Sequence, residues 1–514
     1  MRTRIVTVGV GALSPDEVVA VARDRAHVVL SDDAQAAMEA SRAVIDALAE
    51  DTRPHYGVST GFGALASKSI PGALRAQLQA SLVRSHAASS GAEVEREVVR
   101  ALMLLRLSTL ATGRTGVRPE VAEAYAGLLN ADLTPLVGEY GSLGCSGDLA
   151  PLAHCALAVM GEGHVRDAEG IVHPASDALA AAGLTPVALR EKEGLALING
   201  TDGMLGMLVM AIHDLHELLP TADIAAALTV EALRGTDAVF AADLQALRPH
   251  PGQADSAAVI RAVLQGSDIV AEHAAPTAFT RVQDAYSLRC APQVHGAVRD
   301  TVAHAALVAG RELASAVDNP VVTLDGRVES NGNFHGAPVG YVLDFLAIAV
   351  ADLASISERR TDRMLDPARS HGLPPFLADD PGVDSGHMIA QYTQAGIVSE
   401  LKRLAVPASV DSIPTSAMQE DHVSMGWAAA RKLRRAVDGA QRVVAVEILT
   451  AARALDIRAS SPGPVAAAVV AALREEVAGP GTDRYLAPEI AAAVAFVQSG
   501  RALAAARTAA GGIR

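Results

Sequence analysis

The segment over residues 141–151 holds the residues whose types and order could do the most unusual chemistry. It reads GSLGCSGDLAP, a run of small residues that ordinarily forms a turn, with Asp148 capping the helix that follows. In a tightly bent loop, however, the unhindered nitrogen of Gly147 could attack the carbonyl carbon of Cys145. Loss of water, including the hydroxyl of Ser146, would then leave an exocyclic methylene. The segment is therefore either a plain turn or the source of an electrophile made from the chain itself.

A second group of reactive side chains recurs at three-residue spacing, as Gln283, Tyr286 and Arg289. On a helical turn, side chains at this spacing project the same way. A guanidinium suits bidentate binding of a carboxylate. A tyrosine has a reference pKa of about 10, so it accepts a proton at neutral pH only where positive charge or donated hydrogen bonds favour the phenolate. This segment predicts a base and an anion clamp on one face.

The stretch GSLGCSGDLAPLAH resembles the signature of the aromatic amino acid ammonia-lyases, whose prosthetic group is 4-methylideneimidazol-5-one (MIO). The usual triplet of that family is Ala-Ser-Gly, whereas Cys145 stands first here. Since this side chain lies outside the ring, we expect cyclisation of Cys145, Ser146 and Gly147, with no external cofactor. The resemblance covers nearly the whole chain, from the loop at residues 55–63 (HYGVSTGFG) to the segment at residues 419–426 (QEDHVSMG).

The resemblance implies roles for residues far apart in the sequence. Tyr286 matches the family's catalytic base, and Tyr56 matches the tyrosine of a mobile loop that faces the substrate. Without the other motifs, a tyrosine packing a loop or a lone histidine satisfied in the structure would be the better interpretation of such residues. The positions matched to substrate-binding residues are His86, Asn199, Gln283, Arg289, Phe334 and Glu420.

The substrate expected from the resemblance depends on His86 and Glu420 together. The Ser-His pair at residues 85–86 is similar to the histidine-specific members, in which an acid at the position of Glu420 faces the imidazole. Phenylalanine-specific relatives lack this acid. The resemblance thus implies non-oxidative elimination of ammonia from L-histidine to trans-urocanate, the first step of histidine degradation. MIO would make the amine a better leaving group while Tyr286 takes the β-proton.

Three further positions depart from the common family pattern, and several alternatives stay open. Asp202, Ala285 and Met418 stand where relatives often have Gln, Pro and Asn. One alternative keeps the chemistry but acts on tyrosine or phenylalanine, or re-adds ammonia as an aminomutase. Another is a fumarase-like lyase, although its GSSxMPxKxNP loop is missing here. The last is a catalytically dead helical scaffold, which we would expect to have lost the Ser-Gly pair or Tyr286.

The elements that must position these residues are expected to be long helices. The chain has 514 residues, of which 50% are hydrophobic but only 3% aromatic, so burial must come mainly from Ala, Val, Leu and Ile. We predict a mainly α fold, a long-helix bundle of the fumarase/aspartase-like type with a smaller mixed N-terminal part. The expected division is residues 1–140 for the mixed part, 141–460 for the bundle and 461–514 for short C-terminal helices.

Local patterns place several elements. A strand is expected at the N-terminal end around Ile5, and an apolar seam from Leu433 to Leu455, with spacings of four and three, predicts one long helix. In the segment 341–360 the polar residues cluster on a narrow arc, which predicts a helix buried on nearly all sides. Two Ala-rich helices separated by GPGTDRYLAP are expected in the last fifty residues. Further helices are expected at residues 34–49, 71–88 and 93–112.

Composition excludes several classes of partner. Lys plus Arg is 43 and Asp plus Glu is 58, a net charge of −15 that disfavours nucleic acid. The three cysteines form no C-x-x-C pair, which argues against a disulfide framework or a zinc site and for a reducing compartment. His213, His216 and Glu217 lack the HExxH pattern, so no metal is expected.

No apolar stretch reaches about 18 uncharged residues, so we expect a cytoplasmic protein with no membrane span. Small side chains on long helices favour subunit association. By resemblance we expect a homotetramer with dihedral symmetry, in which segments from three subunits compose each active site.

Overall fold

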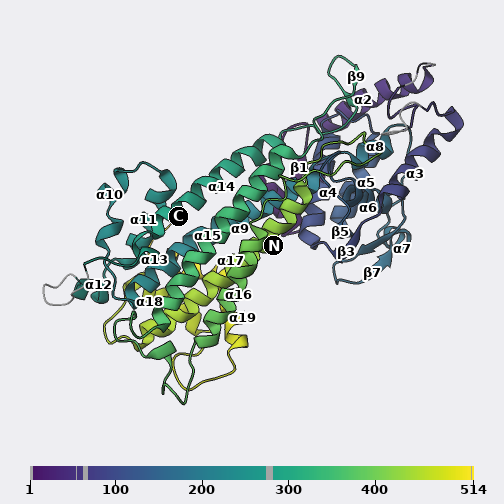
Figure 1. Ribbon diagram of the computed structural model, residues 1–514. Helices are drawn as coiled ribbons and strands as arrows, with labels where there is room; N and C mark the ends of the chain where they lie inside the picture. The colour runs from purple at the N-terminus through teal and green to yellow at the C-terminus, as the bar shows by residue number, and fades with distance from the viewer. Residues whose placement is uncertain are drawn as a thin grey trace. The chain divides into compact units, whose positions relative to one another are not determined.

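The structure is a computed structural model that describes residues 4–51, 53, 55–61, 68–273, 282–510 and 512–513 (Figure 1). The chain forms two compact units, each of which combines distant segments of the sequence. Unit 1 comprises Met1–Ala211, Ala306–Asp344 and Pro407–Arg431, and unit 2 comprises Ile212–Ala305, Phe345–Val406 and Lys432–Arg514. The division expected after residues 140 and 460 concerns segments in chain order and stays a prediction.

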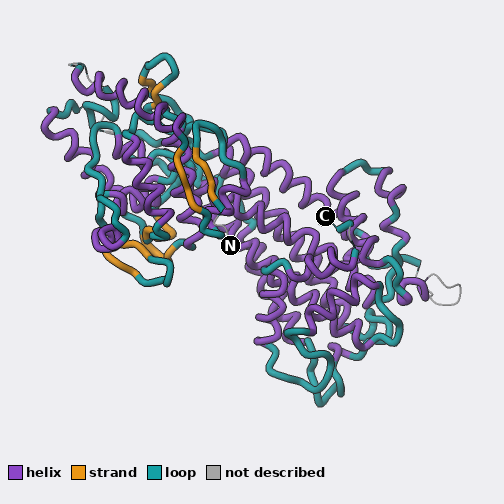
Figure 2. The backbone as a smooth tube through the Cα atoms, turned by 180° about the vertical axis from the view of Figure 1, so that it is seen from behind, coloured by secondary structure: helices purple, strands orange, loops and turns teal. Residues whose placement is uncertain are grey.

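Helices dominate both units, which confirms the mainly α fold (Figure 2). All the strands that the structure describes belong to unit 1 and form small sheets: β1 pairs with β2 in parallel, and β3–β5, β4–β6–β7 and β8–β9 are antiparallel. Their bounds are β1 Ile5–Val8, β2 His27–Leu30, β3 Ser90–Glu93, β4 Thr134–Pro135, β5 Gly138–Tyr140, β6 His164–Arg166, β7 Val172–Pro174, β8 Val321–Val322 and β9 Val328–Glu329.

The helices of unit 1 begin at recognisable signals. Ser14 and Glu17 form a capping box at α1, in which each side chain accepts a hydrogen bond from the other residue's backbone nitrogen, and the Ser31 side chain caps α2. The bounds are α1 Pro15–Ala22, α2 Asp32–Glu50, α3 Arg75–His86, α4 Arg96–Ala111, α5 Pro119–Asn130, α6 Leu149–Val159, α7 Ala175–Ala181 and α8 Glu193–Ile198, with a 3₁₀ turn at Gly72–Leu74 before α3.

Three of these helices, α3, α6 and α8, pack against one another. His86 is the last residue of α3, Asp148 directly precedes α6, and Asn199 directly follows α8. Because the three helices are in mutual contact, side chains at these ends are carried to one region of unit 1 although they come from segments about fifty residues apart.

The core of unit 2 contains parts of four long helices, which are α9 Asp202–Ala232, α14 Ala291–Leu313, α15 Ala337–Leu365 and α17 Gly426–Ile457. Polar side chains tie them together: buried Glu447 of α17 accepts from Arg360 of α15 and from Thr229 of α9. The other helices of unit 2 are α10 Ala242–Ala246, α11 Pro251–Leu264, α12 Asp268–His273, α13 Tyr286–Arg289, α16 Met388–Leu404, α18 Pro464–Arg474, α19 Ala487–Gln498 and α20 Arg501–Ala509, with 3₁₀ turns at Ala238–Phe240 and Pro375–Leu377.

The seam from Leu433 to Leu455 is confirmed, since each of its seven residues is buried on α17. Two other helical predictions are wrong. The last fifty residues contain three helices, because Gly500 adopts a left-handed conformation, with φ of 73°, between α19 and α20. The segment 341–360 is not buried on nearly all sides, since Tyr341, Phe345 and Ile348 are exposed on α15.

Two helical segments, Glu193–Ala232 and Ala337–Leu365, are long and apolar enough to cross a membrane by length and composition alone. Acidic residues interrupt both segments, Asp202 and Asp214 in the first and Asp344 and Asp352 in the second, so neither contains 18 consecutive uncharged residues. The most apolar stretch of the first segment is, however, wholly buried in the protein, as in the core helix of a soluble fold. In the second, 61% of the corresponding stretch is buried.

Candidate active site

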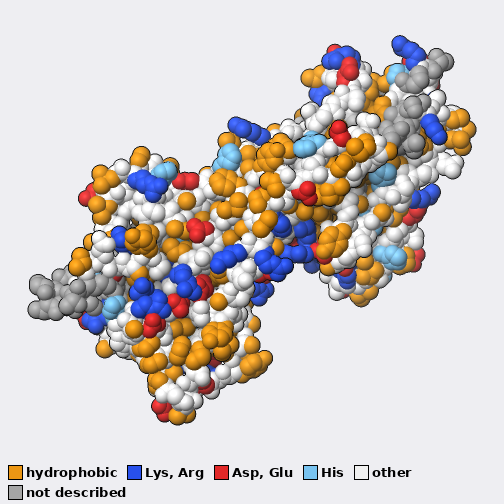
Figure 3. Space-filling view, viewed as in Figure 1, with side chains coloured by type: hydrophobic (Ala, Val, Ile, Leu, Met, Phe, Trp, Pro, Cys, Tyr) orange, Lys and Arg blue, Asp and Glu red, His pale blue; other side chains and the backbone are white. Residues whose placement is uncertain are grey.

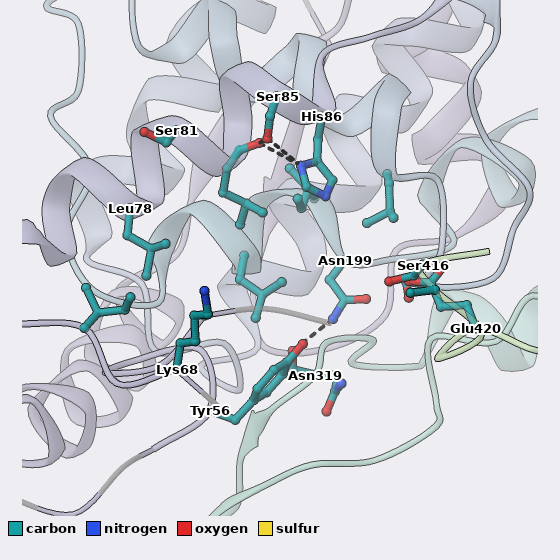
Figure 4. A pocket seen from close by; sticks show the side chains of 18 residues that line it. Tyr56, Lys68, Leu78, Ser81, Ser85, His86, Asn199, Asn319, Ser416 and Glu420 are labelled. Atoms are coloured by element: carbon teal, nitrogen blue, oxygen red, sulfur yellow. Dashed lines mark hydrogen bonds between the residues drawn. The ribbon is translucent and has the colours of Figure 1, made fainter. Parts of the chain in front are cut away.

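A cavity of about 680 Å³ opens in unit 1 where the ends of α3 and α8 meet the residues before α6 (Figure 4). Its lining is mostly apolar, with a few polar groups that could orient a ligand. In Figure 4, Tyr56, His86 and Asn199 reach the cavity from three different segments. The lining residues are Tyr56, Gly61, Lys68, Ile70, Leu78, Ser81, Leu82, Ser85, His86, Ser146, Leu149, Leu195, Ile198, Asn199, Asn319, Ser416, Ala417 and Glu420.

The Cys145–Ser146–Gly147 segment is tightly bent and held against the loop after α8. Gly147 has φ of 78°, and a Cβ there would lie 2.1 Å from the carbonyl oxygen of Gly200, so only glycine fits. The next backbone nitrogen, that of Asp148, donates to the same carbonyl at 2.7 Å. This close contact produces the bend that cyclisation needs.

Asn199 lies beside this bend, and one polar atom of its side chain has no hydrogen-bond partner. The residue is 3% exposed, its Nδ2 donates to the carbonyl of Asn319 at 3.0 Å, and its Oδ1 has no hydrogen-bond partner. A buried, unpaired amide oxygen is costly unless a ligand or prosthetic group satisfies it. The glycine-only bend and this unpaired oxygen together fit an MIO group at residues 145–147.

Arg106 anchors the Asn199 loop from behind. Its guanidinium donates to the carbonyls of Ala196 and Asn199 and lies 3.4 Å from a carboxylate oxygen of Asp202. All four residues are buried. The acid at position 202, one of the departures from the family pattern, thus partners a buried cation that shapes the site.

Asp148 occupies the N-terminal cap position of α6, but its side chain does not cap the helix. The carboxylate instead accepts from Ser142 Oγ at 2.7 Å and from the backbone nitrogen of Met204 at 2.8 Å. The capping interpretation is therefore wrong, because tertiary partners take the lone pairs that a cap would use. Burial raises the pKa of Asp148 to about 7, against these hydrogen bonds, which lower it.

This raised pKa predicts a pH-dependent stability. Between about pH 4 and pH 7 the folded state holds a proton on Asp148 that the unfolded state has released, so the free energy of unfolding falls as the pH rises through this window. Asp148→Asn cannot ionise. Between pH 5 and pH 8, the free energy of unfolding of the parent, measured in urea, should fall by on the order of 2–3 kcal/mol more than that of this variant. The contributions of other titrating groups cancel when the two proteins are compared. A difference in free energy of unfolding that does not change with pH would therefore contradict the prediction.

His86 presents one ring nitrogen to the cavity. Its Nδ1 lies 2.9 Å from the carbonyl of Leu82, which can only accept, so Nδ1 carries the proton. Ser85 Oγ donates to the same carbonyl at 3.0 Å. The Nε2 atom of the neutral ring is then an acceptor available to a ligand N–H group.

Glu420 is presented by a strained turn. Thr415 and Glu420 pair through two backbone hydrogen bonds. Three of the four residues between them, Ser416, Ala417 and Met418, have positive φ, of 52°, 52° and 69°. Left-handed backbone costs roughly 1–2 kcal/mol per non-glycine residue. Such strain concentrates at functional sites, and here it directs an acid into the cavity.

A second cavity, of about 370 Å³, adjoins the first and shares Tyr56, Ser146, Asn319 and Glu420 with it. Phe334, predicted to line the pocket, lies here and not in the larger cavity. The site therefore extends on both sides of Ser146. The remaining lining residues are Cys145, Ser330, His335, Gln419, Asp421 and His422.

Gln283, Tyr286 and Arg289 belong to unit 2 and are not among the residues that line either cavity. The prediction that all three share a helical turn is wrong for Gln283, because Ala285 is extended and α13 begins only at Tyr286. Tyr286 and Arg289 do share the turn, and the Arg289 guanidinium lies 4.6 Å from the centre of the tyrosine ring. Tyr286 is 72% exposed.

The turn of α13 is tied to the core of unit 2. Arg360 donates to the carbonyl of Ser287 at 3.4 Å and to buried Glu447 through two other nitrogens. The Nε atom of Arg289 is buried without a hydrogen-bond partner. This guanidinium thus lies over the ring of an exposed tyrosine on the same turn.

Sequence reasoning missed several residues of the cavity. Asn319 lines both cavities, and its only local signal is the Asn-Pro turn pattern. Lys68, Leu195 and Ser416 carry no motif at all. Residues 62 and 63 of the loop that contains Tyr56 lie outside the described residues. In the part of the chain that is described, no group of three or more His, Cys, Asp or Glu side chains is placed to hold a metal ion.

Comparisons with known proteins identify the family of this chain. A family model described as aromatic amino acid lyase matches residues 13–475. Histidine ammonia-lyase from Streptomyces coelicolor is 66% identical over 513 residues, which cover 99% of each chain. The solved structure of tyrosine aminomutase from Streptomyces globisporus has a TM-score of 0.92 at 38% identity and covers 98% of both chains. That of histidine ammonia-lyase from Trypanosoma cruzi has a TM-score of 0.90 at 37% identity and covers 98% of this chain and 95% of its own. The resemblance inferred from the motifs is confirmed, and the chain belongs to the aromatic amino acid lyase family.

Proposed function

We propose that this enzyme is a histidine ammonia-lyase, which eliminates ammonia from L-histidine to give trans-urocanate. The observation that carries the proposal is that one cavity brings Ser146 together with His86 and Glu420, the two groups suited to binding an imidazole. The names of three curated relatives that are 65–67% identical to this chain support the same substrate.

An MIO group formed from Cys145, Ser146 and Gly147 supplies an electrophilic methylidene that turns the substrate amine into a better leaving group. The bend at Gly147 and the carbonyl of Gly200 hold the segment that forms it. Asn199 lines the same cavity as Ser146, and its unpaired Oδ1 is an acceptor suited to the substrate amine.

The side chains of the cavity bind and orient the substrate. With the substrate ring in its imidazolium form, His86 Nε2 accepts from one ring N–H and the Glu420 carboxylate accepts from the other, so the ring is held at both ends. Phe334 packs in the smaller cavity, and Tyr56, which lines both cavities, faces the reacting carbons. Elimination needs this fixed orientation, because the β-proton and the amine must leave from adjacent carbons.

Tyr286 removes the β-proton, and Arg289 binds the substrate carboxylate. Gln283 is a third substrate-binding residue on the same segment. In this proposal the segment carrying these residues comes from a neighbouring subunit of a homotetramer, as the family resemblance implies.

Exposed apolar side chains support the oligomeric proposal. Phe345 and Ile348 on α15, together with Ile389 and Tyr392 on α16, are between 46% and 62% exposed in the single chain, and apolar patches are visible on its surface (Figure 3). Exposed apolar surface is typical of subunit interfaces. With a net charge of −15 and three free cysteines, we propose a cytoplasmic enzyme.

Substrate selectivity tests the proposed function. Phenylalanine offers no hydrogen-bond partner to His86 or Glu420, and each buried polar group left unpaired costs about 1–3 kcal/mol. The parent enzyme should therefore prefer L-histidine to L-phenylalanine by at least about ten- to a hundredfold in kcat/KM. Glu420→Ala should remove most of this preference, whereas Arg289→Lys should raise KM for every amino acid tested.

Comparable kcat/KM values for histidine, tyrosine and phenylalanine in the parent would refute the histidine assignment and leave the ammonia-lyase chemistry standing. Formation of β-amino acids from any of the three would instead favour the aminomutase alternative. Nuclear magnetic resonance of the product mixture distinguishes the two outcomes.

A further inference from the structure

The side chain that departs from the usual family triplet contacts the acid of the cavity. Cys145 is 7% exposed, and its Sγ lies 3.1 Å from Oε2 of Glu420, a residue 275 positions later in the chain. The hydroxyl of Thr415 donates to the same oxygen, also at 3.1 Å. One carboxylate oxygen thus has two donors, and no described residue donates a hydrogen bond to the other, Oε1.

The thiol is the donor in this contact. Burial, and then the hydrogen bond with Glu420, raise the pKa of Cys145 to about 12, so the S–H group stays protonated at neutral pH. A protonated thiol next to a carboxylate can only donate. The side chain also lies outside the ring that residues 145–147 would form, so the thiol is not consumed by cyclisation.

We propose that Cys145 is a positioning residue, whose thiol holds Oε2 of Glu420 so that Oε1 faces the imidazole of the substrate. This inference rests on the proposed function. The first residue of the MIO-forming segment then has a second task in this chain, which is to orient the group that selects the substrate. An alanine at this position would leave Thr415 as the sole side-chain donor to Oε2, on a turn built from left-handed residues.

Cys145→Ala therefore should raise KM for L-histidine about three- to tenfold, the effect of one modest hydrogen bond, with kcat within about twofold of the parent. Cys145→Ser retains a donor and should restore most of the lost affinity. The inhibition constant of L-phenylalanine, which has no ring nitrogen to reach Glu420, should be the same in all three proteins. Near-UV difference absorbance and an intact mass lower by two waters verify that each variant still forms the prosthetic group.

A binding measurement that does not require MIO provides the second readout. By calorimetry, L-histidine should bind Cys145→Ala/Ser146→Ala about three- to tenfold more weakly than it binds Ser146→Ala. The difference should vanish when Glu420→Ala is added to both proteins, because the thiol acts only through the carboxylate. This comparison stays decisive even where Cys145→Ala impairs cyclisation.

Equal L-histidine affinity with and without the Cys145 thiol would overturn the positioning role. A loss of affinity that persists in the Glu420→Ala background would also overturn it, since the effect would then be one of general packing. Either result can occur while the parent remains selective for histidine and sensitive to Glu420→Ala. Failure of that selectivity, in contrast, would reject the proposed function itself.

Discussion

Ser146→Ala should fold and assemble like the parent but lose at least about three orders of magnitude in kcat, equivalent to about 4 kcal/mol of transition-state stabilisation. The reason is chemical: the methylidene carbon can come only from the Ser146 side chain, and the other groups of the cavity bind and orient the substrate without activating its amine. The measurement is the rate of urocanate formation, followed by its absorbance. The near-UV difference spectrum between parent and variant should show the absorption of MIO, which only the parent contains. The intact mass of the variant should equal the mass of the unmodified chain, without the decrease of two waters expected for the parent.

A matched control is Ser81→Ala, because Ser81 also lines the larger cavity but lies outside the segment that cyclises. This variant should retain activity within about threefold of the parent and keep the MIO absorbance. If Ser146→Ala turned over L-histidine at the parental rate, the electrophile hypothesis would have to be abandoned.

Tyr286→Phe should lower kcat by about 10²- to 10⁴-fold, the usual contribution of a general base, with a much smaller change in KM. The variant keeps the aromatic ring beside Arg289 and removes only the phenol oxygen, so the turn of α13 should be preserved. Single-turnover kinetics with β-deuterated histidine would measure the step directly. A variant with kcat within tenfold of the parent would show that another group takes the proton.

The same variant tests whether sites are shared between subunits. Two inactive variants can restore activity in a mixed oligomer only if their substitutions fall on different subunits of one site. Tyr56 and Glu420 line the same two cavities of one chain, so variants at these positions cannot complement each other. Tyr286→Phe and Ser146→Ala lie in different units of the chain. Mixed under conditions that exchange subunits, these two inactive proteins should regain a measurable part of the activity. No recovery despite demonstrated exchange would indicate sites built within single chains.

Much of the secondary structure and the reactive segment could be predicted because both have strong local signals. The seam on α17 follows helical periodicity, and the bend at residues 145–147 needs small residues in a particular order. The predictions failed where a distant partner overrides a local preference. Asp148 binds Ser142 and Met204 and does not cap α6, and the apolar side chains of α15 remain exposed in the single chain.

The order of residues alone was enough to identify the tripeptide that can cyclise, the family and the helical class. All three follow from motifs and periodicity among residues that are close together in the chain. Tertiary packing decided the composition of the cavity. His86, Asn199 and Glu420 come from separate segments and meet at Ser146 because helices α3, α6 and α8 pack together and the strained turn after Thr415 reaches the same place. The contact between Cys145 and Glu420 joins residues 275 positions apart, and no periodicity or motif in the sequence encodes a hydrogen bond over that separation.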